Sequence, residues 1–245
     1  MNIFGMTDVG VVRSENQDSY TVRQLSEHAA VAVVCDGMGG ARAGNVASAV
    51  AVETFAAAVE DLYRQEIPEG ERACCQLLRE ACLHANSQVY QLSRSDEQYH
   101  GMGTTLVGVL LMGLDAYVVN VGDSRCYHIH EDSIQQVTCD HSLVQLLVNR
   151  GDITPDEARI HPKKNLITRA LGIDREVAAD CYHAELEEGD RLLLCSDGLS
   201  NVLTDQELLE QTMNQLPLEE RCRTMMRMTL EQGAPDNVTI VMAQL

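Results

Sequence analysis

The chain has 245 residues and a formal net charge of −19, with 18 lysines and arginines against 37 aspartates and glutamates. Such a surface repels phosphate backbones and anionic lipids, so the charge argues against nucleic-acid and membrane binding. No apolar run approaches the roughly 20 residues that a membrane helix needs. The first residues also lack the pattern of a secretory signal. We expect a cytoplasmic, monomeric protein with one domain over residues 1–245.

Nine cysteines are scattered along the chain without CxxC spacing. An odd count with no secretory signal predicts reduced thiols. Cys35, Cys126 and Cys195 lie in or beside apolar runs, so we expect them to be small core residues.

The first third of the chain combines a polar opening with a short buried strand. Arg13 and Asp18 stand in a dense polar segment before a predicted strand at 19–22. This segment is either a solvated loop or a place where an arginine meets an anion beside a carboxylate. Residues 31–34 predict a buried strand, which leads into Asp36-Gly37. A carboxylate beside a bare backbone carbonyl suits a hard divalent cation, although Asp-Gly is also a common turn.

The middle of the chain predicts two helices followed by a strand meander. Apolar residues recur at helical spacing over 49–63 and over 73–92, which indicates a covering layer. The strands that follow are joined by short turns, as in an antiparallel sheet. They are predicted at 106–111, 116–121, 126–130 and 134–137. Asp123 comes just after the second of them.

A polar excursion separates the meander from the last strands. A helix beginning near Ser142 ends at Gly151, and Thr154 opens a capping box for a second short helix. We therefore interpret residues 150–165 as a flap over a site.

The last part of the chain adds two more carboxylates at predicted strand ends. A strand at 191–195 ends at Asp197, and a closing strand at 238–242 follows Asp236. Between them lie helices at 204–213, which a capping box opens, and at about 217–233.

Five carboxylates thus lie at predicted strand ends: Asp18, Asp36, Asp123, Asp197 and Asp236. Strand ends from distant parts of an antiparallel sheet meet at one rim. Crowded carboxylates repel one another unless divalent cations neutralise them, and an all-oxygen set favours Mg²⁺ or Mn²⁺ over Zn²⁺. Two such ions can activate a shared water for attack on phosphorus. Arg13 would hold the phosphoryl oxygens.

The order of these motifs resembles the PPM-type (type 2C) metal-dependent serine/threonine protein phosphatases, in their compact bacterial form. The resemblance covers essentially the whole chain. It rests on Thr7–Gly10 with Arg13–Asp18, Asp36–Gly40, Gly103–Thr105, Val121–Arg125, Asp140–Ser142, Thr168–Gly172, Ser196–Gly198 and Asp236-Asn237.

The resemblance implies an α+β fold, a four-layer α/β/β/α sandwich of two antiparallel sheets flanked by helix pairs. It implies that Asp36 bridges two Mn²⁺ or Mg²⁺ ions and that the Gly37 carbonyl binds one of them. Asp197 and Asp236 would complete the other ion's ligands. The remaining roles it implies are metal-bound waters for Asp18, a weaker third metal for Asp123, substrate phosphate for Arg13, and loop support for Asn237.

One position departs from many eukaryotic members, which carry a histidine where Met38 stands. Methionine cannot protonate a leaving alcohol, so a metal-bound water, His141 and His161 are the candidates for the general acid. The expected partners are phosphorylated proteins, namely a Ser/Thr kinase and its substrates. Two alternatives stay open: a non-catalytic phosphoprotein-binding regulator of the same fold, and a phosphatase of a sigma-factor regulatory protein.

Overall fold

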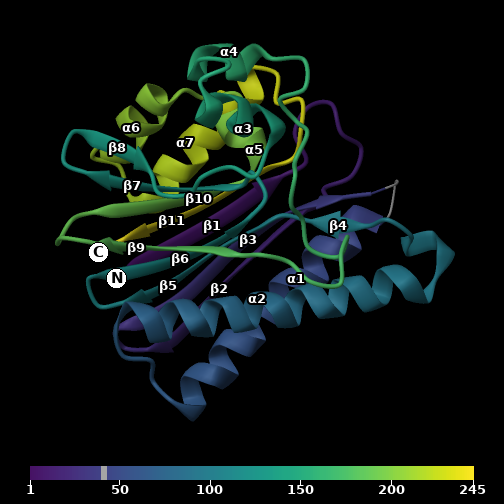
Figure 1. Ribbon diagram of the computed structural model, residues 1–245. Helices are drawn as coiled ribbons and strands as arrows, with labels where there is room; N and C mark the ends of the chain where they lie inside the picture. Colours follow the sequence, from purple (N-terminus) through teal and green to yellow (C-terminus); the bar gives the residue numbers. More distant parts are fainter. Residues whose placement is uncertain (40–42) are drawn as a thin grey trace.

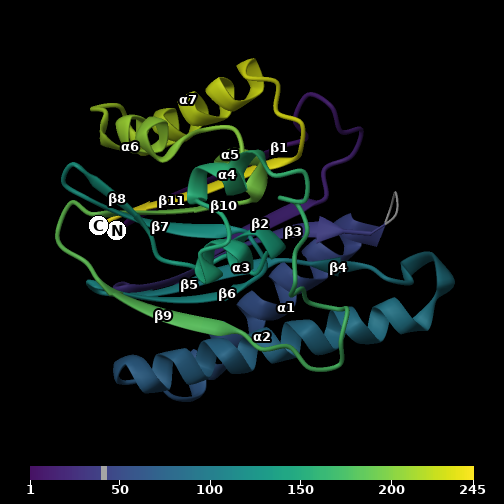
Figure 2. The ribbon, with the colours of Figure 1, turned by 45° about the horizontal axis from the view of Figure 1, so that its top comes forward.

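Two antiparallel β-sheets lie face to face, with helices on both outer sides (Figures 1 and 2). The computed structural model describes residues 1–39 and 43–245, so Gly40 of the Asp36–Gly40 motif lies outside the described residues. The layers run helix, sheet, sheet, helix. This confirms the four-layer α/β/β/α sandwich predicted from the sequence.

The strands divide into two sheets. The first sheet, in spatial order, contains β1 (Asn2–Asp8), β11 (Val238–Gln244), β10 (Arg191–Cys195), β7 (Arg125–His130) and β8 (Ser133–Gln136). The second contains β2 (Asp18–Ser26), β3 (Ala29–Met38), β5 (Leu106–Met112), β6 (Asp115–Val121) and β9 (Asp180–Glu185), with β4 (Gly103–Thr104) paired to the end of β3. Three of these were not predicted: the edge strands β1 and β9, and the two-residue β4.

The helices pair on the outer faces of the sheets. Helices α1 (Ala43–Gln65) and α2 (Gly70–Ser95) cover the second sheet, while α6 (Asp205–Met213) and α7 (Leu218–Glu231) cover the first. Shorter helices are the 3₁₀ helix Glu97–Tyr99, α3 (Leu143–Arg150), α4 (Pro155–Ile160) and α5 (Asp197–Ser200). Among the helices of residues 1–39 and 43–245, none has the length and apolar character needed to cross a membrane.

Three predicted helix boundaries are confirmed by their caps. Thr154 and Thr204 each accept a hydrogen bond from the backbone N–H three residues on, and a glutamate there reaches back to the cap. Each capping box satisfies donors that the first helical turn leaves free. Gly151 ends α3 with φ of 77°, a left-handed conformation that glycine adopts without strain.

Strand β3 is apolar from Ala29 to Cys35 because both of its faces are buried there. Val31, Val33 and Cys35 face the core beneath α1 and α2, whereas Ala32 and Val34 face the core between the sheets. Alternate side chains of a strand point to opposite faces, so a central strand of this sandwich has no polar face. Burying each valine contributes about 1.5–3 kcal/mol, which fixes the strand that carries Asp36.

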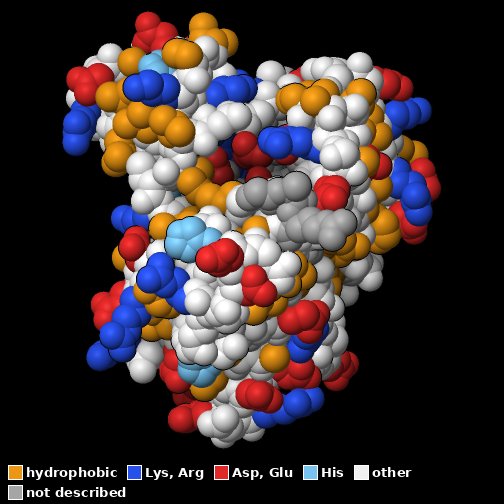
Figure 3. Space-filling model, turned by 90° about the vertical axis from the view of Figure 1, so that its right-hand side faces the viewer, with side chains coloured by type: hydrophobic (Ala, Val, Ile, Leu, Met, Phe, Trp, Pro, Cys, Tyr) orange, Lys and Arg blue, Asp and Glu red, His pale blue; other side chains and the backbone are white. Residues whose placement is uncertain are grey.

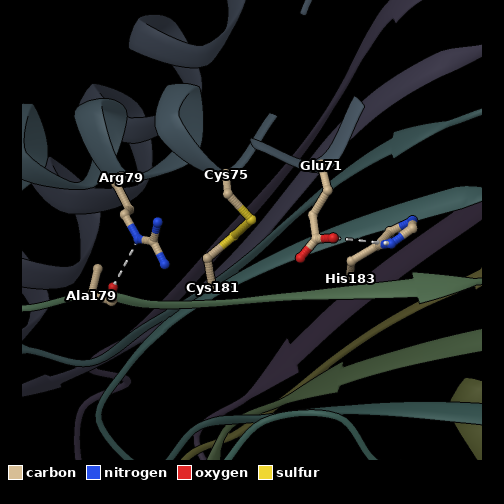
Figure 4. Close-up of a disulfide and its surroundings, with 6 residues drawn as sticks. All are labelled: Glu71, Cys75, Arg79, Ala179, Cys181 and His183. Atoms are coloured by element: carbon tan, nitrogen blue, oxygen red, sulfur yellow. Dashed lines mark hydrogen bonds and ion pairs between the residues drawn. A yellow bond between two sulfur atoms is a disulfide. The ribbon is translucent and has the colours of Figure 1, made fainter. Parts of the chain in front are cut away.

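The cysteines correct one prediction. Cys35, Cys126 and Cys195 are fully buried, as expected, but Cys75 and Cys181 form a disulfide that joins α2 to β9 (Figure 4). The prediction that all thiols are reduced is therefore wrong for this pair. Because β9 is a polar edge strand that the sequence pattern did not reveal, nothing in the spacing placed Cys181 opposite Cys75.

Candidate active site

A cavity of about 260 Å³ brings the predicted site residues together from both sheets. It is lined by Arg13, Gln17, Asp36, Gly37, Met38, Gly39, Thr105, Asp123, Asn165, Ile167, Asp197 and Asp236. Figure 3 shows acidic side chains at the bottom of a hollow on this side of the molecule, with basic side chains near them. Of the predicted ligands, only Asp18 does not line the cavity.

Asp18 and Asp36 are brought together by strand pairing. They stand directly opposite each other on β2 and β3. The backbone around Asp36 is fixed by Thr104 and Thr105: Asp36 N–H donates to Thr105 Oγ1 over 2.9 Å, and Thr104 Oγ1–H donates to the Asp36 carbonyl over 2.8 Å. The Gly-Thr-Thr motif therefore holds the Asp36 segment from β4 and from Thr105, the residue between β4 and β5.

Gly37 permits a close approach of backbone segments around the site. A Cβ placed on it would collide with the Gly44 carbonyl oxygen at the start of α1, and would lie 2.6 Å from the Gln17 carbonyl oxygen. The Gly37 N–H donates to that same Gln17 oxygen over 3.0 Å. Only glycine lets α1 and the loop before β2 both pack against this point.

Asn237 ties the N-terminal loop to the end of β11. Its side-chain N–H groups donate to the carbonyls of Val9 and Glu15, over 2.8 and 3.0 Å, and its Oδ1 accepts from Gln17 N–H over 2.8 Å. These three bonds place the segment carrying Arg13 beside Asp236. Asn237 thus supports the loop, as the resemblance implied.

Arg13 lies at the rim of the cavity. Its Nη2 donates to Asp236 Oδ2 over 2.8 Å, and its side chain is 53% exposed. The bond to Asp236 raises the pKa of Arg13, so the guanidinium keeps its charge. A solvent-accessible cation at the mouth of a carboxylate-lined cavity is placed to meet an incoming anion.

Asp18 and Asp197 each keep one oxygen without a partner. Asp18 Oδ2 accepts from Ser196 Oγ and Thr239 Oγ1, both over 2.7 Å, and Asp197 Oδ2 accepts from Asn201. The other oxygen of each carboxylate is buried and accepts no hydrogen bond from any residue of 1–39 and 43–245. A buried polar atom without a partner costs about 1–3 kcal/mol, so it indicates a missing ligand.

The carboxylates resist ionisation together. Burial, followed by repulsion from neighbouring carboxylates, raises the pKa of Asp36 and Asp123 well above the ordinary range. Burial raises the pKa of Asp18 to about 7 and that of Asp197 to about 6. Divalent cations would remove this conflict and keep all four ionised.

The donor set fits hard divalent cations. It consists of carboxylates and backbone carbonyls, without histidine or thiolate, which suits Mg²⁺ or Mn²⁺. Within the described part of the chain, no three acidic, histidine or cysteine side chains enclose an ion by themselves. Cations here would therefore also take backbone and water oxygens as ligands, which is common for Mg²⁺.

The two histidines considered as general acids are not at the cavity. His161 lies in the segment 150–165 that is predicted to be a flap, and its Nδ1 accepts from Lys163 N–H. Both ring nitrogens of His141 already have partners, Gly122 N–H at one and Asp180 at the other. The structure therefore supports neither as the proton donor.

Sequence analysis missed the groups that hold Asp18. Ser196 and Thr239 are both fully buried, and Thr239 N–H also donates to Ser196 Oγ over 2.9 Å. The available signal was a threonine inside the apolar closing strand. A polar residue at a buried strand position needs a partner, and here that partner is a site carboxylate.

Comparison with known proteins gives the family. Residues 11–239 match the family described as Protein phosphatase 2C. Protein phosphatase PhpP of Streptococcus pneumoniae is 36% identical over 249 residues, which cover 100% of this chain and 98% of that protein. The crystal structure of the Mycobacterium tuberculosis serine/threonine phosphatase PstP/Ppp has a TM-score of 0.87 and 37% identity, covering 100% of this chain and 98% of that one.

A further solved structure bears on the metal. The catalytic domain of the serine threonine protein phosphatase PstP, in complex with two manganese ions, has a TM-score of 0.83 and 36% identity, covering 99% of this chain and 97% of that one. Fold, site and relatives together define a protein phosphatase. The chain belongs to the protein phosphatase 2C family, which confirms both the resemblance and the function predicted from the sequence.

Proposed function

We propose that this enzyme removes phosphate from phosphoserine and phosphothreonine in proteins, using the cavity between the ends of the two sheets. The observation that carries the proposal is the convergence of Asp36, Asp123, Asp197 and Asp236 with Arg13 around one cavity. The raised pKa values and the unpartnered oxygens there support a divalent-cation site.

Each carboxylate has a distinct place in this proposal. Asp36, the Gly37 carbonyl, Asp197 and Asp236 would hold two Mn²⁺ or Mg²⁺ ions, Asp18 would stand behind them, and Asp123 would serve a third, weaker site. Such ions supply charge neutralisation and an activated water for attack on phosphorus. The chain itself orients these groups through Thr104, Thr105, Ser196 and Thr239.

Arg13 would bind the phosphoryl oxygens of the substrate. Arg13→Ala is expected to lower kcat/KM for a phosphothreonine peptide by roughly 10- to 100-fold, because a charge-assisted hydrogen bond contributes about 1.5–3 kcal/mol. If KM rises and kcat stays unchanged, Arg13 binds the phosphate equally in the ground state and the transition state. If kcat falls by the same factor as kcat/KM, Arg13 acts only in the transition state. Arg23→Ala is the matched control, since Arg23 pairs with Glu53 and Glu60 on the surface. Unchanged kinetics in Arg13→Ala would contradict the assignment.

The proposed function is tested by following phosphate release from a phosphothreonine peptide in Mn²⁺ and in chelator. Turnover that needs the cation is the expected result. Binding of the phosphopeptide without any turnover in Mn²⁺ or Mg²⁺ would favour the non-catalytic regulator instead.

Five properties of the protein stay predictions from the sequence. These are the kinase partner, the monomeric state, the cytoplasmic location, the single domain over residues 1–245, and the flap role of 150–165. Asn165, the last residue of that segment, and Ile167 just beyond it line the cavity, which supports the flap prediction.

A further inference from the structure

We propose that His141 is a positioning residue that fixes the turn carrying Asp123. The inference rests on the proposed function, because it explains how this chain orients one of the carboxylates of that site.

His141 grips the turn after β6 at two points. Its backbone N–H donates to the Gly122 carbonyl over 2.9 Å, and its Nδ1 accepts from the Gly122 N–H over 3.1 Å. Both backbone polar groups of the residue before Asp123 are thus occupied by one buried histidine, which is 7% exposed. Gly122 has φ of 108°, and a Cβ on it would lie 2.6 Å from Thr105 Cγ2. The turn is therefore held in a conformation that only glycine accepts.

The far side of the ring is held by β9. Nε2 of His141 lies 3.0 Å from Asp180 Oδ2 and 3.1 Å from Arg169 Nη1. Because the Gly122 N–H occupies Nδ1, the ring proton sits on Nε2 and is donated to Asp180. Arg169 Nη1 also donates to Asp180 Oδ1 over 3.0 Å, which holds that carboxylate in place. The connection runs from Asp180 through His141 to the backbone at Gly122.

The position of Asp123 matters because it borders two cavities. It lines the 260 Å³ cavity and also a neighbouring one of about 520 Å³ beneath α3 and α4. Asp123 follows Gly122 directly, so its carboxylate depends on the backbone that His141 holds. Ser124, the next residue, hydrogen-bonds Thr105 over 2.7 Å, which joins the same turn to the segment of Asp36.

Three variants of His141 distinguish a role in positioning the Asp123 turn from a role in overall stability. Asparagine places an oxygen near the site of Nδ1, so His141→Asn keeps an acceptor for Gly122 and loses the contact with Asp180. His141→Gln and His141→Ala lack that nearby acceptor. The readouts are Mn²⁺ binding followed by electron paramagnetic resonance without substrate, Mn²⁺ half-saturation in turnover, and Tm.

We expect His141→Ala and His141→Gln to weaken the weakest Mn²⁺ site by roughly 10- to 100-fold, the effect typical of residues that orient metal ligands, and His141→Asn to recover most of it. KM measured at saturating Mn²⁺ should stay unchanged. The inference would be overturned if His141→Gln bound Mn²⁺ as tightly as the wild type. It would also be overturned if His141→Asn and His141→Gln weakened Mn²⁺ binding equally. Absence of any Mn²⁺ binding in the wild-type protein would instead refute the proposed function.

A second inference starts from the disulfide. We infer that Cys75–Cys181 is a reversible redox tether between α2 and the start of β9. Figure 4 shows three facing pairs along the two elements, Glu71 with His183, Cys75 with Cys181, and Arg79 with Ala179. Four helical residues and two strand residues both advance about 6 Å, so the pairs stay aligned.

The contacts on either side of the disulfide are weak. Arg79 Nε donates to the Ala179 carbonyl over 3.3 Å at the surface, and Glu71 lies 4.0 Å from His183. Cys181 directly follows Asp180, the residue that holds His141. Loss of the covalent link would therefore loosen the strand end that orients the ring.

The chemistry of the tether is a two-electron oxidation. The Cys75 and Cys181 thiols lose two protons and two electrons to a hydroperoxide, which is reduced to an alcohol or water plus water, and the S–S bond forms. Other thiols are poorly suited to this reaction. Burial raises the pKa of Cys82, Cys195 and Cys222 to about 12, so they stay protonated. Cys139 is partly exposed and serves as the control position.

The full-length protein is compared after treatment with hydrogen peroxide and after reduction with dithiothreitol. Reduction is expected to speed hydrogen exchange in residues 178–185 and to raise the Mn²⁺ concentration for half-maximal turnover several-fold. Cys75→Ser and Cys181→Ser should match the reduced protein in both treatments, and Cys139→Ser should respond like wild type. Failure of peroxide to form the bond, or equal exchange in both states, would overturn the inference, whatever the activity.

Discussion

Asp36→Asn is expected to lower kcat for a phosphothreonine peptide by about 10³-fold, the order of loss seen when one preorganised electrostatic group is removed from an active site. Asp36 lines the cavity, its backbone is held by Thr104 and Thr105, and it is the carboxylate proposed to touch both ions. Asparagine keeps the shape and removes the charge. Steady-state kinetics across a Mn²⁺ titration measure the effect.

The same variant should gain stability while it loses activity. Burial and neighbouring carboxylates raise the pKa of Asp36, so an aspartate here costs the folded, metal-free protein stability at neutral pH, where an unfolded aspartate is ionised without penalty. Asp36→Asn is expected to raise Tm in chelator and to lose most of the Tm increase that Mn²⁺ gives the wild type. Asp61→Asn, on the exposed face of α1, is the matched control. If Asp36→Asn had a lower Tm than the wild type in chelator, the crowded carboxylates would not destabilise the metal-free protein.

The metal-free protein is expected to lose stability as pH rises from about 4 to about 7. In the folded state Asp197 has a pKa of about 6 and Asp18 one of about 7, whereas an unfolded aspartate has about 3.9. Between these values the folded state binds more protons than the unfolded state, so the free energy of unfolding falls with rising pH.

Cation binding should reverse this loss. A cation present at 100 times its dissociation constant adds about 2.7 kcal/mol, or roughly 5–10 °C in Tm for a chain of this size. The increase should be larger at pH 8 than at pH 5. Thermal unfolding at both pH values, in chelator and in Mn²⁺, measures it. A larger increase at pH 5 would contradict the account of the carboxylates.

Much of the site could be predicted because its residues interrupt strong patterns. Asp36 and Asp197 each follow an apolar run that is buried on both faces, and such runs are unmistakable strands. The capping boxes at Thr154 and Thr204 were equally clear, since they join a cap to a glutamate three residues on. Convergence of the carboxylates followed from their places at strand ends, which meet at one rim of an antiparallel sheet, and the family resemblance supported it.

The parts that were not predicted are those whose structure depends on tertiary packing and not on a local sequence pattern. Strands β1 and β9 are edge strands with polar residues, so they lack an apolar run. Missing β9 hid both the Cys75–Cys181 disulfide and the contact of Asp180 with His141. Ser196 and Thr239 support Asp18 across the first and second sheets, a contact between residues 178 and 221 positions apart that no local spacing encodes.

The central claim is that carboxylates from both sheets hold a pair of divalent cations at one cavity. Anomalous diffraction from crystals grown with Mn²⁺ tests it most directly. We expect two strong peaks in the cavity, with Asp36 between them, the Gly37 carbonyl at one, and Asp197 with Asp236 at the other. Mn²⁺ peaks that lie away from these residues in crystals of active enzyme would contradict it.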